Sequence, residues 1–349
     1  MASADLTVMG AGVWGLSVAV ACARRGAHVR VIDPAGPAAG ASGGVVGALA
    51  PHVPEQWNDK KAFQLEALLM AEEFWADIAR LSGEDPGYAR SGRLQPLADA
   101  EAVARAEARA EGAAGLWRGA AEWRVIAAEG LDAWSPGSPT GRLVHDTLSA
   151  RLHPRRATKA LARAFEVQGG EVEREGLPEG PVVWATGVAG LEELSAQAGK
   201  TVGNGVKGQA ALLRPKEFDA RARPQLFVDG LHVIPHADGT VGIGSTSERD
   251  YADGAATDDQ LDALVARARR ICPPLEDADL VERWAGLRPR AKSRAPMLGA
   301  HPFRANAYIA NGGFKIGFGL APLVGEVMAD LVLEGRDRIP AAFQPEASL

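Results

Sequence analysis

Cysteine is scarce in this chain, and an excess of basic charge is absent. Only two of its 349 residues are cysteine, Cys22 and Cys272, which excludes a disulfide framework and leaves no pattern of metal ligands. The formal net charge is −6, which disfavours nucleic-acid binding because phosphate backbones are recognised by basic surfaces. We therefore expect no metal site and no nucleic-acid partner. Cys22 lies among small apolar residues, so we interpret it as a buried core thiol.

One stretch near the N-terminus lacks charge altogether. Residues 6–23 carry no charged side chain, a pattern that signal and membrane segments share. No basic residue precedes the stretch, and Asp5 occupies a position that is positively charged in signal peptides. Three glycines also interrupt it. We therefore expect a buried strand and helix, no integral membrane segment, and a cytoplasmic protein.

The same stretch begins a βαβ pattern that is typical of dinucleotide-binding domains. An apolar strand leads into a G-x-G-x-x-G turn, a helix follows, Gly26 ends it, and a second strand closes with an acidic residue. These parts are residues 6–9, 10–15, 16–25 and 29–32, with Asp33 last. With 46% hydrophobic residues and this length, the chain can form one large or two ordinary domains around a sizeable core.

Each part of this pattern has a physical role. Gly10 permits the tight turn, Gly12 lets the backbone approach a pyrophosphate, and Gly15 lets the helix pack close to the strand. The helix N-terminus offers N–H groups and the positive end of its dipole to phosphates. Asp33 can accept hydrogen bonds from a ribose diol. We predict an adenine dinucleotide at this turn.

Hydrophobic periodicity predicts the remaining elements. We expect helices within the pattern of residues 51–100 and over residues 100–114, 155–167, 258–271 and 320–333, with Pro322 in the first turn of the last. Strands are expected at 171–173, 181–184 and 307–310, and a β-meander at 209–213, 225–228, 231–234 and 240–243.

Several short segments carry a family resemblance, in the same order along the chain. They are the N-terminal turn with Asp33, the small-residue segments 40–44 and 47–51, Ala185–Gly187, Val206–Gln209, Gly286–Pro289, and the glycine-rich loop before Leu320. Together they make the chain resemble the D-amino-acid oxidase and glycine oxidase family of FAD-dependent amine oxidoreductases over nearly its whole length.

The resemblance implies an α/β fold in which a discontinuous Rossmann-like FAD-binding domain is combined with a β-rich substrate domain of antiparallel sheet and helices. The expected boundaries are residues 1–50, 140–205 and 280–349 for the first domain, and 51–139 and 206–279 for the second. FAD is expected to be non-covalent, because no cysteine or histidine occupies the positions where related sarcosine oxidases attach flavin. The implied cofactor-binding residues are Gly10, Gly12, Val13, Trp14, Gly15, Asp33, Ala41, Ser42, Gly43, Gly47, Ala48, Ala185, Thr186, Gly187, Gly313, Phe314, Lys315, Ile316 and Gly317.

The resemblance also implies three catalytic-site residues. Arg288 is expected to hold a substrate carboxylate with two parallel donors, the alternative being a structural arginine. Lys315 is expected to face the far end of the substrate or the flavin, the alternative being a lysine in solvent. His232 replaces a tyrosine that helps to grip the carboxylate in relatives, and it is expected to add a titration near neutral pH unless it is a surface histidine.

Near Arg288 the sequence departs from the residues of relatives, so the identity of the substrate stays open. Ser293 replaces an acidic residue of relatives, and Arg290, Lys292 and Arg294 surround it. This cluster either attracts an anionic substrate or forms a solvated basic loop.

The expected reaction is oxidation of a small amine or amino acid to the imine by hydride transfer to flavin N5, followed by hydrolysis to the oxo acid. Dioxygen or a quinone would reoxidise the flavin. The alternatives are oxidation of a 2-hydroxy acid, demethylation of a secondary amine, a non-catalytic flavin-binding subunit, and an NAD-linked enzyme.

Overall fold

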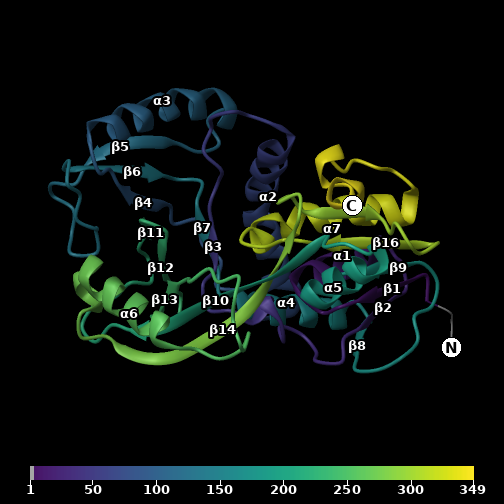
Figure 1. Cartoon of the computed structure of the whole chain (residues 1–349). Coiled ribbons are helices and arrows are strands. Elements are labelled where there is room, and N and C mark those ends of the chain that lie inside the picture. Colours follow the sequence, from purple (N-terminus) through teal and green to yellow (C-terminus); the bar gives the residue numbers. More distant parts are fainter. Residues whose placement is uncertain (1–3) are drawn as a thin grey trace.

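A computed structural model describes residues 4–349 and contains two large sheets. In Figure 1 the eight-stranded sheet lies on the left with α3 and α6, and the six-stranded sheet lies on the right with α1, α5 and α7. The long strands β10 (Gly203–Arg214) and β14 (Asp279–Ala291) run between the two halves. This arrangement confirms the expected mixed α/β fold.

The six-stranded sheet draws strands from three separated stretches of the chain. Its order is β15–β16–β9–β1–β2–β8, and all neighbours are parallel except β15 and β16. The strands are β1 Leu6–Met9, β2 Val29–Ile32, β8 Glu171–Glu173, β9 Val182–Trp184, β15 Met297–Ala300 and β16 Ala307–Asn311.

Helices pack around this sheet through small residues. The helix α1 (Val13–Arg24) is buried over its first ten residues and packs against α7 (Gly317–Glu334). A Cβ at Gly325 would lie 2.7 Å from the carbonyl oxygen of Ser17, so the glycine sets how closely these helices approach. The other helices here are α2 Asp59–Ser82, α4 Pro154–Val167 and α5 Gly187–Ala198.

The eight-stranded sheet has the order β14–β10–β13–β12–β11–β4–β6–β5 and is antiparallel apart from the β11–β4 pair. The predicted meander forms its centre. Helix α6 (Asp259–Ile271) covers the meander with Leu261 and Val265, and α3 (Ala100–Trp117) packs beside β5. The remaining strands are β4 Arg93–Pro96, β5 Trp123–Ala127, β6 Arg142–Asp146, β11 Gln225–Val228, β12 Leu231–Pro235 and β13 Val241–Gly244, and a separate pair joins β3 Ala48–Leu49 to β7 Ala150–Arg151.

Three expectations about elements need correction. The helical pattern of residues 51–100 contains α2 and then strand β4, because Gly83 ends the helix in a left-handed conformation (φ 73°). Helix α1 begins at Val13, inside the glycine motif. Helix α7 begins at Gly317, which places Pro322 in the helix interior.

Both cysteines are buried, as expected for Cys22, and burial raises the pKa of each thiol to about 12. Within residues 4–349, no helix has the length and apolar character needed to cross a membrane. The expected domain boundaries and the cytoplasmic location stay predictions.

Candidate active site

A cavity of about 920 Å³ lies between the two sheets. This volume is at the upper end of the range for ligand pockets, roughly 300–1,000 Å³. Most of the predicted site residues line it: Gly10, Gly12, Val13, Trp14, Asp33, Ala41, Ser42, Gly47, Ala48, Ala185, Thr186, Gly187, His232, Arg288, Gly313, Phe314, Lys315 and Gly317. Three others, Gly15, Gly43 and Ile316, are not among the lining residues of the described chain.

The glycine turn is shaped as the motif requires. Gly10 has φ +107°, and a Cβ there would lie 2.5 Å from the carbonyl oxygen of Ala185. A Cβ at Gly15 would overlap the carbonyl oxygen of Gly10, so this glycine serves packing and not the cavity. By contrast, a Cβ at Gly12 meets only Ser42 Oγ, at 3.3 Å, and Gly12 lines the cavity. The backbone at Gly12 therefore faces open space in the cavity, where a pyrophosphate can approach it closely. We call this space the Gly12 cradle.

Asp33 and Ser42 hold this turn in place. Asp33 Oδ2 accepts a hydrogen bond from the backbone N–H of Ala11 (2.7 Å), while Oδ1 accepts from Ala35 and Gly36. Ser42 Oγ accepts from the N–H of Val13 at 3.0 Å. A carboxylate offers about four acceptor positions. Asp33 therefore keeps capacity for a ribose hydroxyl while it fixes the turn.

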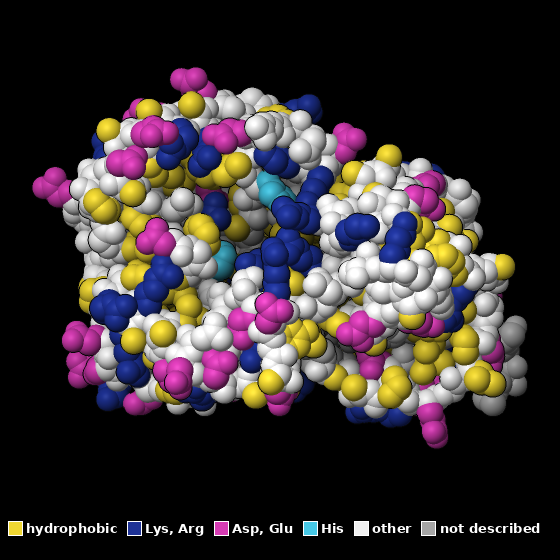
Figure 2. Space-filling view, in the orientation of Figure 1, with side chains coloured by type: hydrophobic (Ala, Val, Ile, Leu, Met, Phe, Trp, Pro, Cys, Tyr) yellow, Lys and Arg dark blue, Asp and Glu magenta, His cyan; other side chains and the backbone are white. Residues whose placement is uncertain are grey.

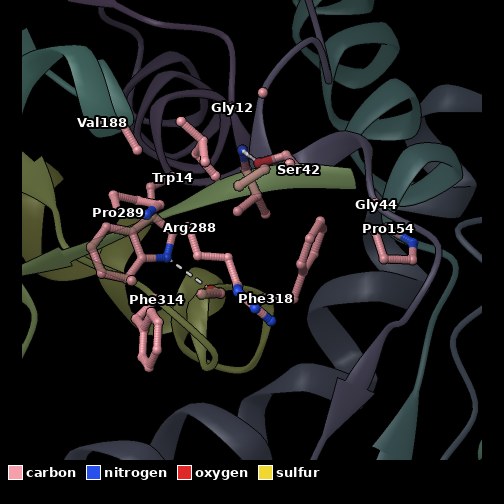
Figure 3. A pocket seen from close by; sticks show the side chains of 18 of the residues that line it. Gly12, Trp14, Ser42, Gly44, Pro154, Val188, Arg288, Pro289, Phe314 and Phe318 are labelled. Carbon is pink, nitrogen blue, oxygen red and sulfur yellow. Dashed lines mark hydrogen bonds between the residues drawn. The ribbon is translucent and has the colours of Figure 1, made fainter. Parts of the chain in front are cut away.

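The C-terminal glycine loop meets the N-terminal turn through Trp14. The indole Nε1 donates to the carbonyl oxygen of Gly317 (2.8 Å), shown as a dashed line in Figure 3. A Cβ at Gly313 would lie 2.9 Å from Trp14 Cζ2, which explains the glycine there. The N–H of Phe314 donates to the carbonyl oxygen of Pro289 at 3.0 Å. The loop is thereby fixed between α1 and β14.

Arg288 extends from β14 into the cavity beside Phe314 (Figure 3). Its Nη1 donates to Ser245 Oγ (2.6 Å), and its Nη2 donates to the carbonyl oxygens of Lys207 (3.1 Å) and Thr246 (2.7 Å). A guanidinium has five N–H donors. These three bonds leave two donors, and Nε has no partner among the described residues. These two donors are Nε–H and one N–H of Nη1, which lie on different edges of the guanidinium, and Nε is buried. A carboxylate would therefore take one charge-assisted hydrogen bond from Nη1, and a two-pronged one only if Arg288 released one of its present partners.

The Val206–Gln209 segment explains how Arg288 is seated. Gly208 lies on β10 beside β14, and a Cβ there would overlap the Arg288 guanidinium. Lys207 and Gln209 flank this glycine, and both bind Glu248: Lys207 Nζ lies 3.5 Å from its carboxylate, and Gln209 Nε2 donates to it at 3.1 Å. The glycine therefore makes room for the guanidinium, while its neighbours anchor the segment that supplies Ser245 and Thr246.

Burial lowers the pKa of Arg288 to about 10, and nearby Glu248 opposes this shift. The guanidinium therefore stays charged near neutral pH.

His232 lines the cavity, but it does not titrate near neutral pH. Burial, followed by the charges of Arg93 and Lys315, lowers the pKa of His232 to about 4. Its ring lies 4.6 Å from that of Phe227, and Nδ1 is buried with no hydrogen-bond partner in the described chain. The expected titration near neutrality is wrong because a desolvated ring among cations resists protonation.

Lys315 is an exposed residue that lines the cavity. Partial desolvation by the surrounding protein, followed by the charges of Arg288 and Arg290, lowers the pKa of its ammonium group. Of the basic cluster near Ser293, Lys292 and Arg294 are exposed and do not line the cavity. Figure 2 shows that Lys and Arg side chains gather over the hollow between the two halves.

Sequence reasoning missed several lining residues, among them Phe227, Ser245, Trp284 and Phe318. Phe318 lies within the glycine-rich loop before Leu320, and its aromatic side chain between Gly317 and Gly319 was an available signal. Phe227 and Ser245 belong to the meander, where the sequence does not specify which strand end faces the cavity.

Comparison with known proteins agrees with this geometry. Residues 5–331 match the family described as FAD dependent oxidoreductase. The chain is 26% identical to the glycine oxidase of Geobacillus kaustophilus over 94% of this chain and 92% of that enzyme. It is 33% identical to the glycine oxidase of Pseudomonas putida, a match that spans about half (52%) of each chain. The fold resembles the crystal structure of iminodiacetate oxidase from Chelativorans sp. BNC1, with a TM-score of 0.81, 21% identity and coverage of 97% and 98% of the two chains. The resemblance noted in the sequence is thus confirmed, FAD is the cofactor, and the chain belongs to the FAD-dependent oxidoreductase family.

Proposed function

We propose that this enzyme oxidises a small amino acid, or a related amine that carries a carboxylate, to the imine. The observation that carries the proposal is Arg288, a charged guanidinium on the wall of the cavity that the glycine turn also lines, with N–H donors that the protein itself does not use. Substrate specificity of this kind rests on a few polar groups at fixed positions in a largely apolar pocket. The glycine oxidase relatives support an amine as the group that is oxidised.

The chemistry that bound FAD would supply is that of an acceptor for a hydride equivalent from the substrate α-carbon. The nitrogen lone pair then forms the C=N bond, and water displaces ammonia or an amine from the imine to give the oxo acid. The cofactor would be held without a covalent bond by the Gly12 cradle, Asp33 and the loop around Gly313.

The residues of the chain would bind and orient the substrate. Arg288 would hold the carboxylate and thereby position the α-carbon. The positive charges of Arg288 and Lys315 disfavour an ammonium group, so the bound amine is neutral, as hydride loss requires. His232, being uncharged, would offer its unpartnered Nδ1 for a hydrogen bond to the substrate.

Anaerobic reduction of the flavin by a substrate panel tests the proposal. The panel contains amino acids of both hands, N-methyl amines, 2-hydroxy acids and amines without a carboxylate. We expect rapid loss of flavin absorbance with at least one amino acid, and production of the oxo acid when dioxygen or a quinone is then supplied. Reduction by 2-hydroxy acids alone, or by no member of the panel, would refute the proposal.

A further inference from the structure

Three cations surround one aromatic ring at the cavity. The ring centroid of Phe314 lies 5.8 Å from Arg288 Cζ, 5.3 Å from Arg290 Cζ and 5.6 Å from Lys315 Nζ. The electron-rich face of an aromatic ring attracts a nearby cation. The ring thus offsets part of the cost of gathering like charges, but it neutralises none of them.

These cations have no carboxylate partner. Among residues 4–349, no Asp or Glu oxygen lies within 4.0 Å of a side-chain nitrogen of Arg288, Arg290 or Lys315. Charges elsewhere on the same strand β14 are paired: Glu282 binds Arg155 at 2.8 Å, and Arg283 binds Asp262 at 2.5 Å. Within the described strand β14, the arginines without a carboxylate partner are therefore Arg288, which lines the cavity, and Arg290, which is next to the cavity-lining residue Pro289.

The unpaired charge repels itself. The pKa of Lys315 is lowered by burial and then by Arg288 and Arg290, so the charged lysine is less stable here than in water. An anion bound between these groups would relieve that repulsion. One carboxylate brings a single negative charge to three cations, so two positive charges stay uncompensated.

We propose that the substrate carries two carboxylates, one held by Arg288 and the second by Lys315, with Arg290 adding to the local positive potential. The class is an amino dicarboxylate: either an α-amino acid with an acidic side chain, or a secondary amine with two carboxymethyl groups. Arg288 Cζ and Lys315 Nζ lie 5.8 and 5.6 Å from the centroid of the same ring, so they are at most about 11 Å apart, and a dicarboxylate of a few carbons, hydrogen-bonded at each end, can span that separation. The assignment of a reacting amine rests on the proposed function, whereas the assignment of two anionic groups rests on the cations alone.

The other anion at this site is the pyrophosphate of FAD. Its expected cradle is at Gly12 and Ser42, which lie apart from Phe314 in Figure 3. The pyrophosphate therefore leaves the cations at Phe314 unpaired.

The test compares two unreactive ligands of equal chain length, succinate and butyrate. Each is titrated into the FAD-loaded enzyme, and binding is followed by the change in flavin absorbance. We expect succinate to bind about ten- to a hundredfold more tightly, as one additional charge-assisted hydrogen-bonded pair provides. Lys315→Met should bring the ratio close to one, and Lys315→Arg should retain most of it.

Lys292→Met serves as the matched control. It removes the same charge from an exposed lysine directly after β14 that does not line the cavity. It should leave the ratio within twofold of the unmodified enzyme.

Equal binding of the two acids by the unmodified enzyme would overturn the proposal. So would a Lys315→Met variant that keeps the preference but shifts the flavin midpoint potential, because Lys315 would then serve the flavin.

Anaerobic reduction separates this proposal from the proposed function. Faster reduction by aspartate or glutamate supports the acidic α-amino acid, and faster reduction by iminodiacetate supports the secondary amine. If no amine reduces the flavin while the succinate preference is intact and lost in Lys315→Met, the amine assignment fails and the two-anion site stands. If monocarboxylic amino acids reduce the flavin and no succinate preference exists, the two-anion site fails and the amine assignment stands.

Discussion

Arg288→Ala should remove substrate binding without removing the cofactor. The three hydrogen bonds that Arg288 makes go to Ser245 and to two backbone carbonyls, none of which belongs to the glycine turn. The substitution eliminates the guanidinium charge with its unused N–H donors, and it leaves the substrate carboxylate unpaired in the cavity. The expected cost is about 2–5 kcal/mol, or roughly thirty- to several-thousandfold in the apparent dissociation constant of the substrate. Arg288→Lys should recover only part, because an ammonium has too few donors to keep the bonds to Ser245, Lys207 and Thr246 and also hold a carboxylate.

The assay is stopped-flow reduction of the flavin by the best amine of the panel, with FAD content measured in parallel. Arg283→Ala is a matched control, since Arg283 lies on the same strand and pairs with exposed Asp262 instead of facing the cavity. The control should show unchanged substrate dependence. Near-identical substrate dependence in Arg288→Ala would mean that the arginine is structural. A loss of reduction in proportion to lost FAD would mean that it supports the cofactor.

Three further predictions concern the cofactor and the histidines. Gly12→Val should fold but lose FAD, because a Cβ at residue 12 meets only Ser42 Oγ, whereas Gly15→Ala should destabilise the fold through overlap with Gly10. Thermal unfolding of the apoproteins and flavin content after gel filtration distinguish the two variants. A Gly12→Val enzyme that is active and carries a full complement of FAD would contradict the role of Gly12 in pyrophosphate binding. Asp33→Ala should weaken FAD about ten- to a hundredfold and also lower apoprotein stability, because three backbone N–H groups lose their acceptor; an unchanged FAD dissociation constant would count against the ribose role. Burial lowers the pKa of both His232 and His236 to about 4, so the unfolded state binds protons first as the pH falls and stability declines between about pH 6.5 and 4. The slope should reach about 1.4 kcal/mol per pH unit for each histidine, and denaturant unfolding across this range should give a shallower slope for His236→Gln; identical slopes would refute the assignment.

The sequence alone predicted the elements whose pattern is local. The turn at residues 10–15 follows from glycines that a strand and a helix flank, and the meander follows from the Asp-Gly turns at Asp229 and Asp238. Strand β14 has no such signal, since its residues alternate irregularly between charged and apolar and most are only half-buried. It forms a strand because β10 supplies its hydrogen-bonding partner over the whole length.

The cavity shows the same difference between features that a local sequence pattern predicts and features that depend on tertiary contacts. Arg288 was predicted from a short motif, but the ring of Phe314 that gathers three cations is a tertiary arrangement. The charge state of His232 was predicted wrongly because burial and the nearby Arg93 and Lys315 set its pKa. No local pattern encodes either neighbour.

The six-stranded sheet has a consequence for the order of events during synthesis. Its centre pairs β1 with β9 and β9 with β16, so residues 6–9 wait for residues 182–184 and then for residues 307–311. Contacts so distant along the chain slow folding, because a long loop must close before they contribute. The glycine loop that completes the cavity emerges from the ribosome later still. We therefore expect the nascent chain to acquire its cofactor only near the end of translation, with the strand edges of β1 and β9 exposed to chaperones until then.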